Sequence, residues 1–207
     1  MLGASAYPVR MTQNSGSMWR TQWNIANAVT AARILMVPFV AWALLVDGGA
    51  SAPWRWVATV LFVVAAATDK VDGHLARSRG LVTDLGKLLD PIADKALIGT
   101  ALVGLSLLGE LWWWVTIVIL VRELGITAMR LLVMDRFVLA ASRGGKLKTV
   151  LQSVALSILL LPRGVLPELV HTAGYAVMGL AVVVTLVTGL DYVVRTLRNP
   201  VVREGHA

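Results

Sequence analysis

The chain contains no cysteine, few charged residues and few acidic ones. Charged side chains make up 15% of its 207 residues, and only 12 residues are Asp or Glu, whereas 57% of the residues are hydrophobic. Without cysteine there is no disulfide, no thiolate-bound zinc or iron–sulfur cluster and no thiol nucleophile. So little charge beside so much apolar surface excludes an ordinary soluble domain, a disordered chain and a nucleic-acid-binding protein. We therefore expect an integral membrane protein.

Six apolar blocks follow a polar N-terminal stretch, and about 20 apolar residues are needed to cross a bilayer as a helix. The blocks cover approximately residues 34–46, 54–67, 91–109, 111–134, 147–161 and 169–194. Residues 26–33 are expected to form an interfacial helix before the first block. The prediction is an all-α integral membrane protein with six transmembrane helices and this N-terminal interfacial helix. Its parts are a disordered cytoplasmic tail (1–23), a membrane catalytic domain (24–198) and a C-terminal cytoplasmic tail (199–207).

The basic residues predict the orientation of these helices. Lys and Arg exceed Asp and Glu by enough to give a net charge of +7, and such residues collect in cytoplasmic loops and near anionic headgroups. Only Arg55 and Arg163 fall on the side opposite to both termini. We therefore expect both termini to be cytoplasmic, in a bacterial inner membrane. Residues 112–114, three consecutive tryptophans, would then belong to an aromatic belt on the external side.

Aspartates interrupt the apolar pattern between the second and third blocks. Asp69 and Asp72 are three residues apart, and Asp90 and Asp94 are four apart, so each pair shares one face of a helix. Four carboxylates close together at a membrane surface repel one another unless cations lie between them. Oxygen ligands of this kind suit hard divalent metals, so we predict Mg²⁺ or Mn²⁺ bound by these four residues.

The residues around the aspartates indicate a phosphate-bearing substrate. Gly73 and Gly86 permit close approach to the two helices, and Ala76 keeps the adjacent turn clear. Arg77 offers a planar guanidinium for phosphate oxygens. Two metals and an arginine at a phosphoanhydride are typical of phosphoryl-type transfer, with a carboxylate available as a base.

These residues stand in the order D-x2-D-G-x2-A-R-x8-G-x3-D-x3-D, which resembles the complete motif of the CDP-alcohol phosphotransferases. The resemblance implies a homodimeric membrane enzyme that moves a phosphatidyl group from a CDP-linked lipid to an alcohol and releases CMP. It also implies that Asp69, Asp72, Asp90 and Asp94 bind two metal ions and that Asp94 is the general base. The residues that would line the nucleotide are Asn27, Thr30, Gly73, Ala76, Arg77, Thr83 and Gly86.

The segment NIANAVTAAR resembles family members that use CDP-diacylglycerol as donor and glycerol 3-phosphate as acceptor. The segment LLDPIADK resembles the same enzymes and also the related eukaryotic-type cardiolipin synthases. A phosphorylated acceptor requires fixed positive charge near the metals. An unpaired charge inside the fourth block would be costly, so we expect Glu123 to hold Arg122 in place. The residues predicted to bind the acceptor phosphate are Arg122, Arg130, Arg143, Lys146 and Lys148.

Other functions agree with parts of this pattern. The same family includes cardiolipin synthases, which use phosphatidylglycerol, and phosphatidylinositol phosphate synthases. A divalent-cation transporter would also place carboxylates among apolar helices, but a transport path needs polar groups deeper in the membrane or on both sides. An inactive scaffold of the same fold is disfavoured because no position of the motif is lost.

Overall fold

The computed structural model describes the backbone of residues 25–78, 84–133 and 143–198, and the side chains of residues 29–68, 89, 92–129 and 145–194. The described chain is helical, with no strand in those ranges. Its long helices are α2 (Ile25–Leu45), α3 (Ala52–Ser78), α4 (Asp84–Leu107), α5 (Trp113–Val133), α6 (Arg143–Leu159) and α7 (Glu168–Arg198). A single 3-10 turn, η1 (Val46–Gly49), follows α2. The predicted all-α fold is therefore confirmed.

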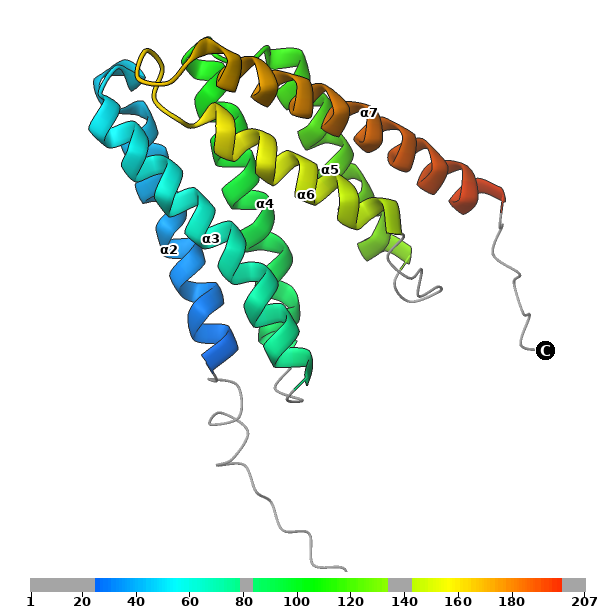
Figure 1. Ribbon diagram of the computed structural model, residues 1–207. Helices are drawn as coiled ribbons and strands as arrows, with labels where there is room; N and C mark the ends of the chain where they lie inside the picture. The colour runs from blue at the N-terminus through cyan, green and yellow to red at the C-terminus, as the bar shows by residue number, and fades with distance from the viewer. Residues whose placement is uncertain (1–24, 79–83, 134–142, 199–207) are drawn as a thin grey trace, which may run out of the picture.

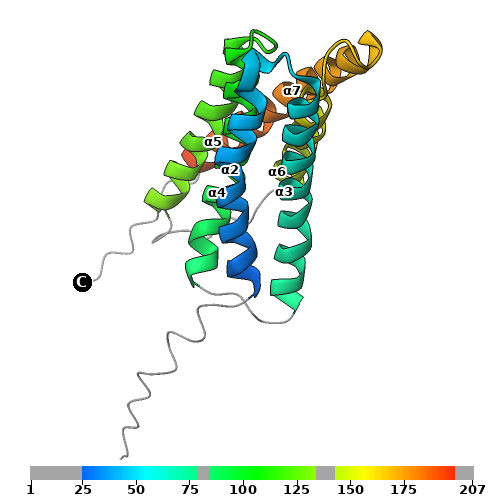
Figure 2. The same ribbon diagram turned by 90° about the vertical axis from the view of Figure 1, so that its left-hand side faces the viewer.

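The helices alternate in direction, so the connections between them lie in turn at one end of the molecule and at the other. Figure 1 shows α2 beginning at the lower end and α7 running from the upper end down to the right, while the connections after α2, α4 and α6 lie at the upper end. Helices α2, α3 and α4 form one group, and α5, α6 and α7 lie beside it. The two groups meet at the upper end and spread apart below, as Figure 2 also shows.

Tight turns at the upper end depend on left-handed backbone conformations. Asp47, Gly48 and Gly49 have φ angles of 53°, 62° and 75° in the turn after α2. Gly109 has a φ of 70° between α4 and α5, where Glu110 N–H donates to the carbonyl of Leu105 over 2.9 Å. Glycine adopts these angles without a side-chain penalty, and this is a common way to end a helix. The predicted tight hairpin of the third and fourth blocks is thus formed by α4 and α5.

Two helix boundaries differ from the sequence prediction. Pro91 was expected to lie near the start of the third block, but α4 begins at Asp84 and Pro91 lies within it. Residues 26–33 were expected to form a separate interfacial helix, yet they continue without a break into the rest of α2. Arg33 is buried, and its Nε donates to the carbonyl of Ala65 in α3 over 3.2 Å. This arginine therefore joins α2 to α3 instead of marking the end of a surface helix.

The interior is built from aliphatic and aromatic side chains of all six helices. Fully buried members of this core include Leu44, Phe62, Leu97, Leu102, Ile119, Leu156 and Met178. In a bilayer these side chains stabilise the fold through close van der Waals packing between the helices. At the α2–α3 contact, the rings of Trp42 and Trp54 lie 4.6 Å apart in an edge-to-face arrangement. The core therefore fixes the relative positions of the helices that carry the aspartates.

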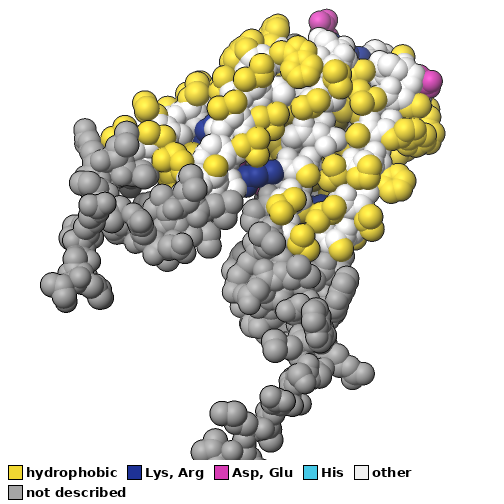
Figure 3. Space-filling model, turned by 180° about the vertical axis from the view of Figure 1, so that it is seen from behind, with side chains coloured by type: hydrophobic (Ala, Val, Ile, Leu, Met, Phe, Trp, Pro, Cys, Tyr) yellow, Lys and Arg dark blue, Asp and Glu magenta, His cyan; other side chains and the backbone are white. Residues whose placement is uncertain are grey.

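Large apolar side chains also cover the outside of the molecule. On α7 the exposed residues Leu180, Val183, Val187 and Leu190 follow helical spacing and form one stripe. The space-filling view in Figure 3 shows hydrophobic side chains spread over much of the rear face, and the acidic side chains seen on that face lie toward its upper end. Two helical segments, Val29–Gly49 and Glu168–Val194, are long and apolar enough to cross a bilayer. A surface of this kind is suited to contact with lipid rather than water.

At the upper end, Arg55, Glu110, Arg163 and Tyr175 form an ionic cluster, which we call the Arg55 cluster. Arg55 is 1% exposed and binds both carboxylate oxygens of Glu110, at 3.2 and 2.8 Å. It also donates to the carbonyls of Leu159 and Leu160 at 2.9 and 3.1 Å. The last carbonyls of a helix have no partner within it, so Arg55 completes the end of α6. The two arginines predicted for the external side thus meet at one end of the molecule.

Candidate active site

The signature residues lie on two helices at the lower end of the molecule, opposite the Arg55 cluster. Helix α3 continues to Ser78, so Asp69, Asp72, Gly73, Ala76 and Arg77 all lie in one regular helix. Helix α4 carries Gly86, Asp90 and Asp94. Spacings of three and four residues within regular helices place each pair of aspartates one turn apart. The ends of α3 and α4 that carry them lie at the same side in Figure 1.

Asp94 is the one signature residue whose side chain falls within the described part of the chain. The side chains of Asp69, Asp72, Gly73, Ala76, Arg77, Gly86 and Asp90 lie outside it, as does Thr83 altogether. No group of three His, Asp or Glu side chains suited to a metal occurs among the described residues. The four aspartates of the motif on α3 and α4 offer carboxylate oxygens, the type of ligand that Mg²⁺ and Mn²⁺ prefer.

Asp94 borders a small cavity between α4, α5 and α6. The cavity has a volume of about 40 Å³, and its polar wall consists of Asp94, Lys95, Glu123, Thr149 and Gln152. Its remaining wall is apolar and is formed by Ile98, Ile119, Leu120 and Leu124. A carboxylate in such a cavity can accept a proton from a small polar molecule bound there. We call this space the Asp94 cavity.

A group of interacting charges lies behind the Asp94 cavity and consists of Arg122, Glu123 and Lys148, held by Thr188; we call it the Glu123 cluster. Arg122 Nη1 lies 3.2 Å from Glu123 Oε1, and Arg122 Nη2 donates to the hydroxyl of Thr188 over 3.1 Å. Lys148 donates to the same carboxylate oxygen of Glu123. Helices α5, α6 and α7 each contribute to the cluster. The predicted pairing of Glu123 with Arg122 is present.

Two basic side chains, Arg122 and Lys148, share the single carboxylate of Glu123 in the Glu123 cluster. Lys148 is only 4% exposed. A buried ammonium group is costly unless it is paired, and Glu123 supplies the pairing. Asp94, Lys95 and Arg122 are close enough to Lys148 to interact with it electrostatically. The cluster therefore places positive charge beside the carboxylate of Asp94.

The backbone of α7 makes room for Arg122 at Gly189. A β-carbon at that position would lie 3.1 Å from Cγ and 3.4 Å from Nε of Arg122. These separations are closer than ordinary van der Waals contact, so the absence of a side chain lets the arginine lie across the helix. The sequence prediction missed Gly189 and Thr188. The one sequence feature that could have indicated these two positions is a threonine next to a glycine in an apolar helix.

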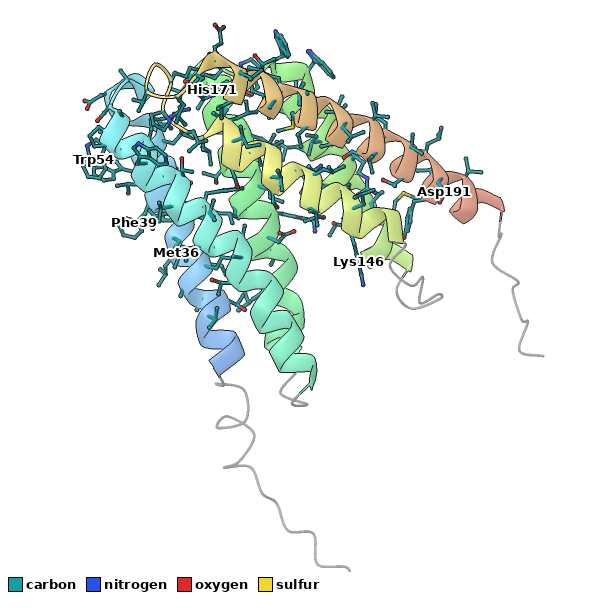
Figure 4. The ribbon with its side chains drawn as sticks, viewed as in Figure 1. Met36, Phe39, Trp54, Lys146, His171 and Asp191 are labelled. Carbon is teal, nitrogen blue, oxygen red and sulfur yellow. The ribbon has the colours of Figure 1, made fainter. Side chains whose placement is uncertain are left out.

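The other predicted binding residues have different surroundings. Lys146 is exposed at the start of α6, and its side chain points toward the lower end in Figure 4. Figure 3 shows Lys and Arg side chains gathered in a hollow of the rear face. Thr30 is buried on α2. The side chains of Asn27, Arg130 and Arg143 lie outside the described residues. Thus the structure brings together Asp94, Arg122 and Lys148 from three helices.

A helical fold with an apolar exterior, a paired-aspartate motif on two neighbouring helices and a buried cationic cluster defines a class of membrane transferase. The profile of the CDP-alcohol phosphatidyltransferases matches residues 23–187. The chain belongs to this family, and the family resemblance of the sequence is confirmed.

Several relatives extend this match over most of the chain. It is 50% identical over 176 residues to a protein of Mycobacterium tuberculosis (strain ATCC 25618 / H37Rv) named probable phosphatidylglycerophosphate synthase, covering 85% of this chain and 83% of that protein. It is 38% identical to the CDP-diacylglycerol–glycerol-3-phosphate 3-phosphatidyltransferase of Bacillus subtilis (strain 168), over 82% of this chain and 93% of the relative. A protein of the same name from Rickettsia felis (strain ATCC VR-1525 / URRWXCal2) is 35% identical, over 84% and 95%.

Proposed function

We propose that this protein transfers the phosphatidyl group of CDP-diacylglycerol to glycerol 3-phosphate, giving phosphatidylglycerol phosphate and CMP. The observation that carries the proposal is the position of Asp94 in a cavity bordered by the Glu123 cluster. A base and a cationic group in the same site suit an acceptor with a hydroxyl at one end and a phosphate at the other. The names of the relatives from three bacterial groups support the same donor and acceptor.

In the proposed reaction, Asp94 takes the proton from the C1 hydroxyl of glycerol 3-phosphate. The resulting alkoxide oxygen forms a bond to the phosphorus on the lipid side of CDP-diacylglycerol. The bond from that phosphorus to the bridging oxygen of the diphosphate breaks, and CMP leaves with the electron pair. Arg122, positioned by Glu123 and Thr188, attracts the acceptor phosphate and orients the hydroxyl toward Asp94. Further acceptor contacts are proposed for Arg130, Arg143, Lys146 and Lys148.

Two divalent ions, Mg²⁺ or Mn²⁺, are proposed to be held by Asp69, Asp72, Asp90 and Asp94. When bound, such ions neutralise charge on the attacking and leaving oxygens of a phosphoryl-type transfer. The nucleotide is proposed to be lined by Asn27, Thr30, Gly73, Ala76, Arg77, Thr83 and Gly86. Arg77 suits the diphosphate because its planar guanidinium forms paired hydrogen bonds with phosphate oxygens.

We further propose a homodimer in the inner membrane with six spans per chain. The domain division into tails at 1–23 and 199–207 and a catalytic part at 24–198 belongs to this proposal. Both termini would be cytoplasmic, because six spans return the chain to the side on which it started and basic residues collect on the cytoplasmic side. The aspartates would then face the cytoplasm, where glycerol 3-phosphate is dissolved, while the donor reaches them from the lipid.

The test is an acceptor panel with purified protein, Mg²⁺, CDP-diacylglycerol and one labelled acceptor in each reaction. Glycerol 3-phosphate should give a phosphorylated phosphatidylglycerol and an equal amount of CMP. Turnover with phosphatidylglycerol or inositol phosphate instead would transfer the assignment to another acceptor. Divalent-cation flux into liposomes without CMP release would indicate a transporter. Chelation of the metal with EDTA should abolish CMP release, and added Mg²⁺ should restore it.

Asp94→Asn should lower the rate at least about 100-fold, because general-base catalysis typically contributes that much or more. Asp47→Asn is the matched control. Asp47 is exposed in the turn after α2, at the opposite end, and has a φ of 53° that asparagine also accepts. Full activity of Asp94→Asn would remove Asp94 as the base.

A further inference from the structure

The Asp94 cavity contains a polar residue that the proposed reaction has not used. Gln152 lies on α6, is 1% exposed and lines the cavity together with Asp94 and Thr149. A carboxamide has two donor hydrogens and an acceptor oxygen. Burying such a group away from water is costly unless its polar atoms are bound. The burial of Gln152 in an apolar helix therefore indicates that its polar atoms have partners or a function.

One role of Gln152 is to form a contact between α6 and α7. The Nε2 atom of Gln152 donates to the hydroxyl of Thr185, which is fully buried, over 3.0 Å. This hydrogen bond fixes the side-chain rotation and assigns the carboxamide oxygen to the acceptor role. The carboxamide oxygen and the second amide hydrogen of Gln152 are then left for other partners, and the oxygen can accept a hydrogen bond from a molecule in the cavity. Thr149 is held separately, since its hydroxyl donates to the carbonyl of Gly145 over 3.3 Å.

The volume of the Asp94 cavity limits the size of the group that can contact Gln152. A volume of about 40 Å³ admits about three water-sized groups, since one water requires roughly 10–15 Å³ of such space. The hydroxyl-bearing end of a three-carbon polyol fits this description, and a six-membered polyol ring is too large. Among the side chains that border this space, the Asp94 carboxylate and the Gln152 carboxamide can each accept a hydroxyl hydrogen, while the Glu123 carboxylate is engaged by Arg122 and Lys148. Two neighbouring hydroxyls are the complementary group.

We propose that Gln152 is a specificity-determining residue that accepts a hydrogen bond from the C2 hydroxyl of the acceptor while Asp94 acts on the C1 hydroxyl. This inference rests on the proposed function and adds to it the recognition of a vicinal diol. A site built to bind a hydroxyl rejects an analogue that lacks it, because the buried polar group is then left unpaired. Gln152 thus selects glycerol 3-phosphate over phosphorylated alcohols with a single hydroxyl.

The probe is 3-hydroxypropyl phosphate, which keeps the phosphate and the attacking hydroxyl of glycerol 3-phosphate and lacks only the C2 hydroxyl. Purified wild-type protein with Mg²⁺ and CDP-diacylglycerol should prefer glycerol 3-phosphate by at least about 100-fold in kcat/KM. In Gln152→Met, which keeps the length of the side chain, this preference should fall at least about tenfold. The loss should come from glycerol 3-phosphate, with the rate for the analogue nearly unchanged.

Thr116→Val is the matched control, because Thr116 also forms a buried hydrogen bond between two helices, to Ser106 over 2.7 Å, and does not border the cavity. It should leave the preference unchanged. Thr185→Val serves as the second variant and should reduce the preference by releasing the carboxamide.

Each possible result either supports or contradicts the proposed role of Gln152. Equal use of both acceptors by the wild type overturns the inference, even if no variant can be purified. An unchanged preference in active Gln152→Met protein overturns it too, while the proposed function stands. Turnover of neither acceptor by the wild type contradicts the proposed function itself and removes this inference with it.

Discussion

Arg122 on α5 donates from Nη2 to the hydroxyl oxygen of Thr188 on α7, over 3.1 Å. Its other terminal nitrogen, Nη1, lies 3.2 Å from Glu123. The guanidinium is therefore fixed at both ends, by its own helix and by the last helix of the chain. A fixed cation loses less freedom when a phosphate binds than a mobile one does. This arrangement makes α7 part of the site although it carries none of the signature residues.

The close approach of Arg122 to α7 predicts the effect of Gly189→Ala. The added methyl group would lie 3.1 Å from Cγ of Arg122, and the arginine cannot move away without stretching its contacts with Glu123 and Thr188. We expect KM for glycerol 3-phosphate to rise about tenfold, the equivalent of about 1.4 kcal/mol, with a smaller change in KM for the donor. Steady-state kinetics with each substrate varied in turn measures this.

Gly179→Ala in the same helix is the control for that substitution. Nothing lies within 4 Å of a β-carbon at Gly179, and alanine favours a helix over glycine by about 1 kcal/mol. This variant should keep wild-type kinetics. If both variants behave alike, the contact between Gly189 and Arg122 has no part in acceptor binding.

The shared oxygen of Glu123 predicts that Glu123→Gln will affect folding as well as activity. Glu123 accepts from Arg122 and from Lys148, so a neutral side chain would leave two like charges together in a poorly solvated place. Removing one partner of a buried ion pair costs about 3–5 kcal/mol. The melting temperature in detergent should fall clearly, as followed by circular dichroism, together with the rate of CMP release. Glu168→Gln, at the exposed start of α7, should change neither.

Local patterns in the sequence were sufficient to predict the helices and to identify the aspartate motif of the family. Apolar blocks follow from the thickness of a bilayer, and the aspartate spacings follow from helical geometry. The pairing of Glu123 with Arg122 could be predicted because a single charge inside an apolar helix requires a neighbouring partner. The start of α4 could not be placed, since Pro91 resembles a helix start and is here accommodated inside the helix.

The remaining parts of the site depend on how distant helices are rotated against each other. Lys148 was predicted to meet the acceptor, together with its neighbour Lys146. In the structure Lys148 turns inward to Glu123 while Lys146 is exposed. Gln152 and Thr185 are 33 residues apart and meet only because α6 packs along α7. Nothing local in either helix specifies that rotation, so such contacts become visible only in three dimensions.

The contact between α2 and α4 predicts that Gly104→Ala will destabilise the protein. A β-carbon at Gly104 would lie 2.4 Å from Cδ2 of Leu44, which is fully buried and has little room to adjust. Overpacking of a close-packed core typically costs about 1–3 kcal/mol. Gly99→Ala, one helical turn and a half earlier on α4, meets only Leu120 at 3.4 Å and should be tolerated. Thermal unfolding in the same detergent compares the two variants, and equal melting temperatures would contradict the close contact.

The Arg55 cluster predicts a substitution that lowers stability and leaves the chemistry intact. In Arg55→Lys, one ammonium group would have to replace a guanidinium that binds both oxygens of Glu110 and the final carbonyls of α6. A lysine cannot reproduce this planar geometry. We expect a loss of about 3 kcal/mol, at the low end of the range for a broken buried ion pair.

Arg163→Lys is the matched control within the Arg55 cluster. Arg163 lies 3.4 Å from the same carboxylate, but its side chain is 47% exposed, and pairs in that setting are worth less than about 1 kcal/mol. Below its melting temperature, Arg55→Lys should retain kcat/KM for both substrates within about twofold, because Arg55 lies in the first turn of α3 and the motif aspartates that α3 carries lie in its second half. Thermal unfolding and CMP release measured on the same preparation separate the two effects. A loss of activity with unchanged melting would mean that the upper end of the molecule acts on the site directly.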